Sequence, residues 1–215
     1  IADGLLRRTA KLRAVVEIPQ VEDIKVHCGR PRGWAKLGTP TISKVTRNAM
    51  PLEIVTVPCL KDNYAYLAHD AATGATAVID VPDAAPIVNA LHARDWHASH
   101  ILITHHHGDH IDGVRALAAA TGARVIGAAA DAHRLPKLTE AVREGDLVRI
   151  GMSEGHVIEV PGHTSGHIAF HFPDSGVVFT ADSLMALGCG RLFEGTPAQM
   201  WQSLSKLSAL PPETL

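Results

Sequence analysis

"ILITHHHGDHIDGV", residues 101–114, places an apolar, strand-like run directly before a cluster of histidines and aspartates. Alternate side chains of an extended segment point the same way, so His105 and His107 are expected to share a target. A glycine then lets the chain turn, and Asp109 and His110 reach a neighbouring point from the entrance of a helix. Imidazole and carboxylate groups suit zinc, and also iron or manganese. The spacing predicts parts of two adjacent metal sites at a strand-to-helix turn.

Two further candidate ligands follow other predicted strands. His163 lies in "VPGHTSGH", and Asp182 lies in "VVFTADSL". A carboxylate can bridge two cations about 3.5–4 Å apart with its two oxygens, so Asp182 is the candidate bridge. His167 and His171 are interpreted as neighbouring or packing residues rather than ligands, and His106 is expected to face away from the metals.

From residue 50 onward, short strands alternate with a few helices. Helices are predicted over 83–95, 112–122 and 196–210, and the strand before the histidine cluster over 100–105. Strands outnumber helices, and the helices fall between groups of strands. This order predicts an α/β fold, a layered sandwich of two sheets with helices outside, rather than a strict βαβ repeat.

Charge divides the chain into two unlike parts. Residues 1–49 hold ten of the 20 Lys and Arg but four of the 22 Asp and Glu, which gives +6, and residues 50–215 carry −8. In the first part, "LLRRTAKLRAVVEI" could form the short basic amphipathic helix of a targeting or nucleic-acid arm, but "CGRPRGWAKLGTP" has no periodicity. We therefore interpret residues 1–49 as a leader or extension outside the fold and residues 50–215 as the folded domain. The acidic balance of the domain argues against nucleic-acid binding.

The composition also limits the compartment and the cysteine chemistry. The mean hydropathy is +0.08, and no apolar stretch is long enough for a bilayer, so no membrane association is expected. The three cysteines form no CxxC pair, which argues against disulfides and against a cysteine-rich zinc site. Cys189, between two glycines, is expected to be a small buried residue and not a nucleophile. A cytoplasmic location is the default expectation.

Four segments together resemble glyoxalase II, the hydroxyacylglutathione hydrolase of the metallo-β-lactamase superfamily. They are "VPCLKDNYAYL", "THHHGDHIDG", "VPGHTSGHIAF" and "FTADSLMALGCGRLFEGT". The resemblance implies an αββα sandwich of two mixed sheets and two divalent metal ions, with zinc favoured. By position, His105, His107 and His163 would hold the first metal, Asp109 and His110 the second, and Asp182 would bridge them. A further histidine of the family would follow "LPPET", so we expect the chain to be truncated before it and before the helical glutathione-binding region.

The resemblance also implies a reaction and a substrate. The expected activity is hydrolysis of the thioester in S-(2-hydroxyacyl)glutathione, such as S-lactoylglutathione, which detoxifies methylglyoxal. Asp109 is the catalytic candidate beside the attacking water, although we favour a role as a ligand only. Arg191, Leu192 and Phe193 occupy the positions that contact glutathione in the family. A guanidinium can pair with a glutathione carboxylate, and an aromatic ring can pack on the peptide.

Two other functions remain open at this point. One is a persulfide dioxygenase of the same superfamily, which uses a single iron. The other is a metal-binding fragment without catalytic activity, because the last histidine ligand of the family is absent. The small-molecule thioester is the expected partner, and the protein is expected to be a monomer.

Overall fold

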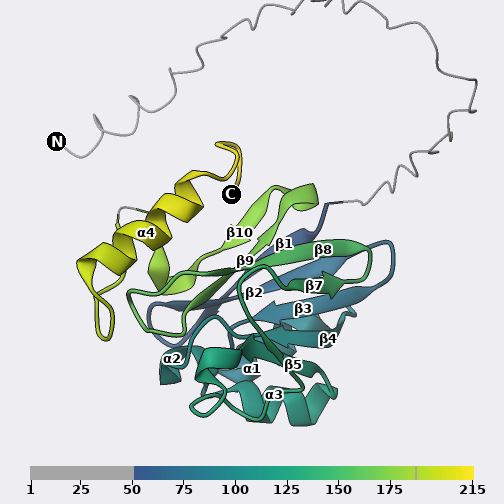
Figure 1. Cartoon of the computed structure of the whole chain (residues 1–215). Coiled ribbons are helices and arrows are strands. Elements are labelled where there is room, and N and C mark those ends of the chain that lie inside the picture. The colour runs from purple at the N-terminus through teal and green to yellow at the C-terminus, as the bar shows by residue number, and fades with distance from the viewer. Residues whose placement is uncertain (1–50, 187) are drawn as a thin grey trace, which may run out of the picture. The chain divides into compact units, whose positions relative to one another are not determined.

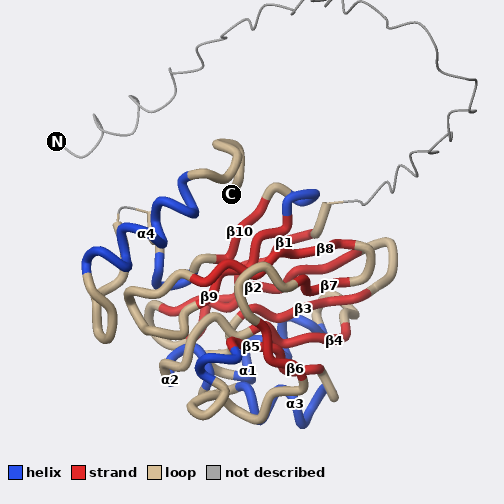
Figure 2. Tube along the Cα trace, viewed as in Figure 1, coloured by secondary structure: helices blue, strands red, loops and turns tan. Residues whose placement is uncertain are grey.

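The computed structural model of the chain describes residues 51–186 and 188–215. The predicted leader, residues 1–49, lies outside the described residues. In the described part, two β-sheets share a buried core, and helices cover their outer faces (Figure 1). Figure 2 shows the strands of both sheets stacked between these helices. The predicted αββα sandwich is confirmed.

The first sheet has six strands in the order β1-β2-β3-β4-β5-β6. These are β1 (Glu53–Cys59), β2 (Asn63–Asp70), β3 (Ala75–Ile79), β4 (His97–Leu102), β5 (Arg124–Ala128) and β6 (Glu140–Val142). The first three pair antiparallel, and β3 to β6 pair parallel. Parallel neighbours need crossover connections, and α1 (Ala84–His92) and α3 (Val114–Thr121) lie in two of them.

The second sheet is antiparallel, with the order β10-β9-β8-β7. Its strands are β7 (Leu147–Ile150), β8 (Ser153–Glu159), β9 (Ile168–Phe172) and β10 (Val177–Phe179). Helix α4 (Pro197–Ser208) covers its outer face, where Leu207 packs with Val160 and Ala169. Short 3-10 helices are formed by Ala129–Asp131, Pro173–Ser175 and Ala181–Ser183.

The apolar run in the opening sequence reflects burial on both faces of β4. Ile101 packs under α1 and α3, whereas Leu102 packs in the core between the two sheets. Strand β2 of the same sheet does the same with Leu67 and Ala68. Successive side chains of a strand point to opposite faces, so a strand buried on both sides needs continuous rather than alternating apolar residues.

The parallel arrangement of β3 and β4 brings their carboxyl ends to the same edge of the sheet. Asp80 follows β3 there, and its N–H donates to the carbonyl of Leu102 at 3.0 Å. Strand β4 ends at Leu102, three residues earlier than predicted, so His105 lies in a loop and not in a strand. Ligands of open α/β sheets bind at this edge, and the polar residues gather there.

The ends of the helices follow the sequence signals. The Asp83 carboxylate accepts a hydrogen bond from the N–H of Ala85 at 3.0 Å and caps α1, and Gly122 ends α3 with φ 70°. Strand β6 was not predicted. The prediction that Cys189 is buried was wrong: its side chain is exposed beyond a turn closed by the Met185 N–H and the Gly188 carbonyl. No helix within the described ranges is both long and apolar enough to span a bilayer.

Candidate metal centre

The loop after β4 carries the first group of histidines. His105 is buried, with 1% of its surface exposed, and His107 is half-buried. His107 lies immediately before the short helix α2 (Gly108–Ile111), which supplies Asp109 and His110. The rings of His105 and His107 lie with centroids 4.8 Å apart. The two side chains therefore approach the same point, as predicted, although the backbone between them is not in a strand.

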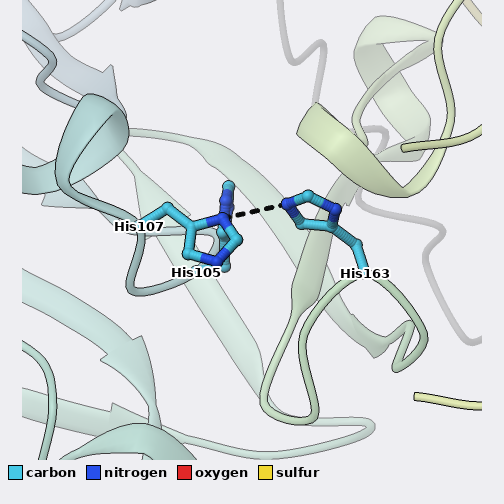
Figure 3. A group of neighbouring side chains, drawn as sticks. All are labelled: His105, His107 and His163. Carbon is cyan, nitrogen blue, oxygen red and sulfur yellow. Dashed lines mark hydrogen bonds between the residues drawn. The ribbon is translucent and has the colours of Figure 1, made fainter. Parts of the chain in front are cut away.

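His163 reaches the same point from the loop after β8. Its Nε2 lies 3.0 Å from Nδ1 of His107, as Figure 3 shows. One nitrogen from each of His105, His107 and His163 lies within 4.8 Å of the other two. His163 is 3% exposed, so the three imidazoles meet in a largely buried place. Three converging imidazoles at this separation are a donor set that can hold a divalent cation.

His110 and Asp182 extend the group on one side. Asp182 lies in the Ala181–Ser183 turn, and its Oδ1 is 3.3 Å from Nε2 of His110. Its other oxygen, Oδ2, is 3.2 Å from Nε2 of His163. The two oxygens of one carboxylate thus face two different histidines. This is the arrangement expected of a carboxylate shared by two neighbouring cations.

The other nitrogen of each buried histidine is held by a partner outside the group. Nδ1 of His110 donates to Oδ2 of Asp80 at 2.9 Å, and Nδ1 of His163 donates to the Arg191 carbonyl at 2.6 Å. Nδ1 of His105 donates to the Thr104 hydroxyl at 3.0 Å, because that hydroxyl itself donates to Asp80. With each Nδ1 held by these partners, the Nε2 atoms of His105, His110 and His163 are directed inward, where a proton or a cation can bind.

Sequence reasoning missed Asp80, which the structure places behind both His105 and His110. One atom from each of these three residues lies within 4.8 Å of the others, so distance alone would make Asp80 a ligand. Its oxygens are already occupied: Oδ1 accepts from the N–H of Thr104 at 2.8 Å, and Oδ2 accepts from the Thr104 hydroxyl and from His110. We therefore assign Asp80 to orienting the ligands. The sequence shows only that Asp80 directly follows an apolar strand, and it is the parallel pairing of this strand with β4 that places Asp80 behind the histidines.

The donor set fits a divalent ion on an observation independent of the sequence. Nε2 of His105 is buried and has no hydrogen-bond partner among the described residues. An unpaired polar atom at this depth is costly, and a cation bound by the converging Nε2 atoms would satisfy it. Burial, and then the neighbouring histidines, lower the pKa of His105, which keeps this ring neutral as a ligand must be.

On the side of His110 and Asp182, the surroundings favour the charged forms of the side chains, in contrast to the neutral His105. Burial acts to lower the pKa of His110, but hydrogen bonds to Asp182 and Asp80 raise it to about 10. The hydrogen bond from His110 lowers the pKa of Asp182, against the effect of burial. A positive charge is therefore favoured between these two carboxylates, whether a proton or a cation carries it.

Asp109 lies apart from the tightest groups. Its Oδ2 is 3.9 Å from Nε2 of His110 and accepts a hydrogen bond from Nδ2 of Asn63 at 2.9 Å. The side chain is 53% exposed. Asp109 is thus near the His110 side of the group and open to solvent, and its role as a ligand stays a prediction.

The remaining predicted residues surround the group. The Phe193 ring lies 5.3 Å from the rings of both His107 and His163, and the Arg191 guanidinium lies 5.1 Å over Phe193. Leu192, which lies between Arg191 and Phe193 in the sequence, is half-buried. His167 is fully buried and stacks on His105 at 4.5 Å, which fits the interpretation as a packing neighbour.

Two other histidines, His106 and His171, lie outside the converging group of imidazoles. His106 turns toward Asp131, with Nδ1 3.2 Å from Oδ2 of that residue, as expected for a side chain that faces away from its two neighbours. His171 lies in β9 and has His156 as its ring neighbour, with centroids 6.5 Å apart. Neither belongs to the groups that could hold a metal.

A cavity of about 650 Å³ borders the group on the side of His110 and Asp182. Its walls are mainly apolar and include Tyr66, Phe179 and Met185. The carboxylate and the imidazole therefore meet solvent-accessible space next to apolar surface, as in many small-molecule sites.

Comparison with known proteins assigns the chain to a family. A family model described as the metallo-beta-lactamase superfamily matches residues 65–215. The chain belongs to the metallo-beta-lactamase superfamily. Membership implies divalent metal binding, and the described residues include histidine and aspartate groups that could hold such an ion.

Individual relatives of this superfamily are similar to the chain over most of its described residues. A hydroxyacylglutathione hydrolase of Cereibacter sphaeroides is 73% identical over 166 residues, which make up 77% of this chain and 65% of that protein. The chain therefore spans about 65% of the length of this curated relative.

Solved structures show the same fold. ETHE1 from Myxococcus xanthus is 32% identical with a TM-score of 0.65, and the match covers 77% of this chain and 73% of that one. TTHA1623 in a di-iron-bound form is 27% identical with a TM-score of 0.63, and the match covers 74% of this chain and 87% of that one.

Proposed function

We propose that the chain carries the catalytic metal centre of a glyoxalase II, which hydrolyses S-(2-hydroxyacyl)glutathione to glutathione and a 2-hydroxy acid. The observation that carries this proposal is the Asp182 carboxylate, whose two oxygens face His110 and His163 from one turn. The name and the 73% identity of the Cereibacter sphaeroides relative support the substrate class. Detoxification of methylglyoxal in the cytoplasm, by a monomer, is part of the same proposal.

The proposed ligands form two subsites that share Asp182. The first subsite comprises His105, His107 and His163, and the second comprises Asp109 and His110. Two zinc ions are proposed, although the same nitrogen and oxygen donors also suit iron or manganese. The di-iron form of TTHA1623, a protein of the same fold, supports a centre with two metals.

The reaction needs a nucleophile at neutral pH and stabilisation of a developing oxyanion. Both would come from divalent ions held by the proposed ligands, which lower the pKa of bound water toward about 7 and polarise a carbonyl. The chain supplies orientation: Asp80, Thr104 and the Arg191 carbonyl hold the imidazoles in the required tautomers. Arg191 and Phe193 stand at the rim, where they can pair with a carboxylate and pack on the peptide of glutathione. A thiolate leaves readily, so no strong general acid is required.

Removal of metal by a chelator is expected to abolish thioester hydrolysis, because the described residues offer no activated serine or cysteine nucleophile at the centre. Zinc added back should restore activity, and metal content measured beside turnover of S-lactoylglutathione tests both steps. About two metals per chain with turnover would support the enzyme. One or no metal without turnover would instead support the non-catalytic metal-binding fragment.

A persulfide dioxygenase of the same superfamily is the second candidate, because the superfamily match alone fits both activities. The position of Asp182 between two histidines favours two metals over the single iron of that reaction. Oxygen consumption with glutathione persulfide separates the two candidates. Uptake of oxygen without thioester hydrolysis would reject the glyoxalase II assignment.

Asp80→Asn is expected to weaken metal binding by about 10- to 100-fold, the usual cost of losing an outer partner of a ligand. The asparagine amide removes the negative charge behind His110. Its NH2 group is a donor, whereas Thr104 and His110 need an acceptor at this position. Asp95→Asn is a matched control, because both aspartates have φ 55° and Asn tolerates this conformation. Metal content after equilibration with buffered zinc should fall for Asp80→Asn alone. Equal metal content in both variants would show that Asp80 has no such role.

A further inference from the structure

An ionic cluster beside the metal centre joins segments that are distant in the sequence. Nη2 of Arg134 donates to Oδ1 of Asp131 at 2.6 Å and to Oε2 of Glu194 at 3.2 Å, and Nη1 of Arg134 donates to the other oxygen of Glu194. Ser165 adds two hydrogen bonds to Oε2 of Glu194, from its N–H at 2.7 Å and from its hydroxyl at 2.8 Å. The proposed reaction uses none of these side chains directly.

The pair of Arg134 and Glu194 has the character of a strong ionic contact. Both side chains are 28% exposed, and both terminal nitrogens of Arg134 face the two oxygens of Glu194. The hydrogen bond from Arg134 lowers the pKa of Glu194 to about 2, and Glu194 raises the pKa of Arg134. Bidentate pairs of this kind add geometric specificity that an exposed, single-contact pair lacks.

Glu194 belongs to a segment that touches the first metal subsite through its backbone. The N–H of Phe193 donates to the carbonyl of His163 at 3.1 Å, and the imidazole of His163 donates to the carbonyl of Arg191 at 2.6 Å. Two residues on, a Cβ added at Gly195 would lie 2.5 Å from Cα of Gly162. The segment 191–195 therefore packs at backbone distance on the loop that carries His163.

Hydrophobic burial does not hold this segment. Phe193 contacts the rings of His107 and His163 but is 58% exposed. Arg191 is exposed as well, with its guanidinium over Phe193. Polar contacts therefore hold the segment that carries both side chains: the backbone hydrogen bonds of Phe193 and Gly195, and the side-chain contacts of Glu194 with Arg134 and Ser165.

The opposite end of the cluster reaches the loop with the other ligands. Nδ1 of His106 lies 3.2 Å from Oδ2 of Asp131, and Nε2 of His106 lies 3.2 Å from Nη1 of Arg134. His106 stands between His105 and His107 in the sequence. The close approach also requires a glycine, since a Cβ at Gly166 would lie 2.2 Å from Cγ of Asp131.

We propose that Arg134 and Glu194 are positioning residues that hold Arg191 and Phe193 over the His107 and His163 side of the centre, and so set the affinity for the anionic peptide part of the thioester. This inference rests on the proposed glyoxalase II function. It assigns the pair to substrate binding and not to the chemical step. A contact that acts equally on the bound substrate and on the transition state changes KM and leaves kcat unchanged.

Glu194→Gln in the metal-loaded protein tests the proposal. We expect KM for S-lactoylglutathione to rise about tenfold, with kcat within about twofold of the wild type and metal content unchanged. The matched control is Glu140→Gln, which removes an exposed Arg–Glu pair between β5 and β6, with 2.6 Å between Arg124 and Glu140. KM should stay unchanged in this control. Arg134→Lys, which keeps the charge but not the two-pronged contact, should give a smaller rise in KM than Arg134→Gln.

Amide exchange gives a readout that does not depend on activity. Exchange of the Phe193 N–H, followed by NMR, should become about tenfold faster in Glu194→Gln and stay unchanged in Glu140→Gln. If the wild type hydrolyses no thioester but exchange responds in this way, the proposed function fails and the positioning role stands. Unchanged KM and unchanged exchange in both Glu194→Gln and Arg134→Gln would overturn the positioning role. A fall in kcat that accompanies a fall in unfolding temperature, with KM unchanged, would also overturn it.

Discussion

Asp182→Asn is expected to lower kcat for S-lactoylglutathione hydrolysis by more than about 100-fold. Loss of a partner outside the ligand set already costs about 10- to 100-fold, and Asp182 faces both proposed subsites directly. The asparagine keeps the shape of the side chain but has one oxygen where Asp182 offers two, to His110 and to His163. It also removes the negative charge that the hydrogen bond from His110 stabilises. Metal content per chain, measured beside turnover, should fall below that of the wild type.

The control for this variant is Asp174→Asn. Asp174 lies in the Pro173–Ser175 turn, as Asp182 lies in the Ala181–Ser183 turn, and both are the middle residue of a three-residue 3-10 helix. Asp174 is exposed, whereas the oxygens of Asp182 face His110 and His163. We expect wild-type turnover and metal content for this control. Wild-type turnover of Asp182→Asn would contradict both the bridging role and the proposed mechanism.

The convergence of the histidines could be predicted because the signals are local. His105 and His107 are two residues apart in a motif with fixed spacing, and both side chains approach one point although β4 ends at Leu102. The layer order was also predictable, since a strand buried on both faces leaves a continuous apolar run such as residues 101–103. His163 and Asp182 were candidates because each is a polar residue that follows a predicted strand.

The parts that could not be predicted depend on contacts between distant segments. Asp80 lies 30 residues from His110, and only the parallel pairing of β3 with β4 brings the two together. The pair of Arg134 and Glu194 is separated by 60 residues, and no local pattern marks either residue. The exposed position of Cys189 likewise depends on a turn that its flanking glycines do not specify.

His105→Ala is expected to remove the stabilisation that metal binding gives the fold, together with most of the activity. His105 is 1% exposed, and its Nε2 has no partner among the described residues, so the metal is its proposed partner. A ligand present at about 1,000 times its Kd stabilises the native state by about 4 kcal/mol, which a chelator would remove from the wild type. In His105→Ala, thermal unfolding should occur at the same temperature with and without chelator, because little metal binds.

The exposed His97, at the start of the strand β4 that precedes the His105 loop, provides the matched control. His97→Ala removes an equal number of atoms without touching the centre, so its unfolding temperature should still fall when metal is removed. The metal-free forms of both variants should retain wild-type circular dichroism, because alanine removes packing at a single position. A fall in unfolding temperature on chelation of His105→Ala as large as in the wild type would show that His105 is not a ligand. The first subsite would then have to be rebuilt around His107 and His163.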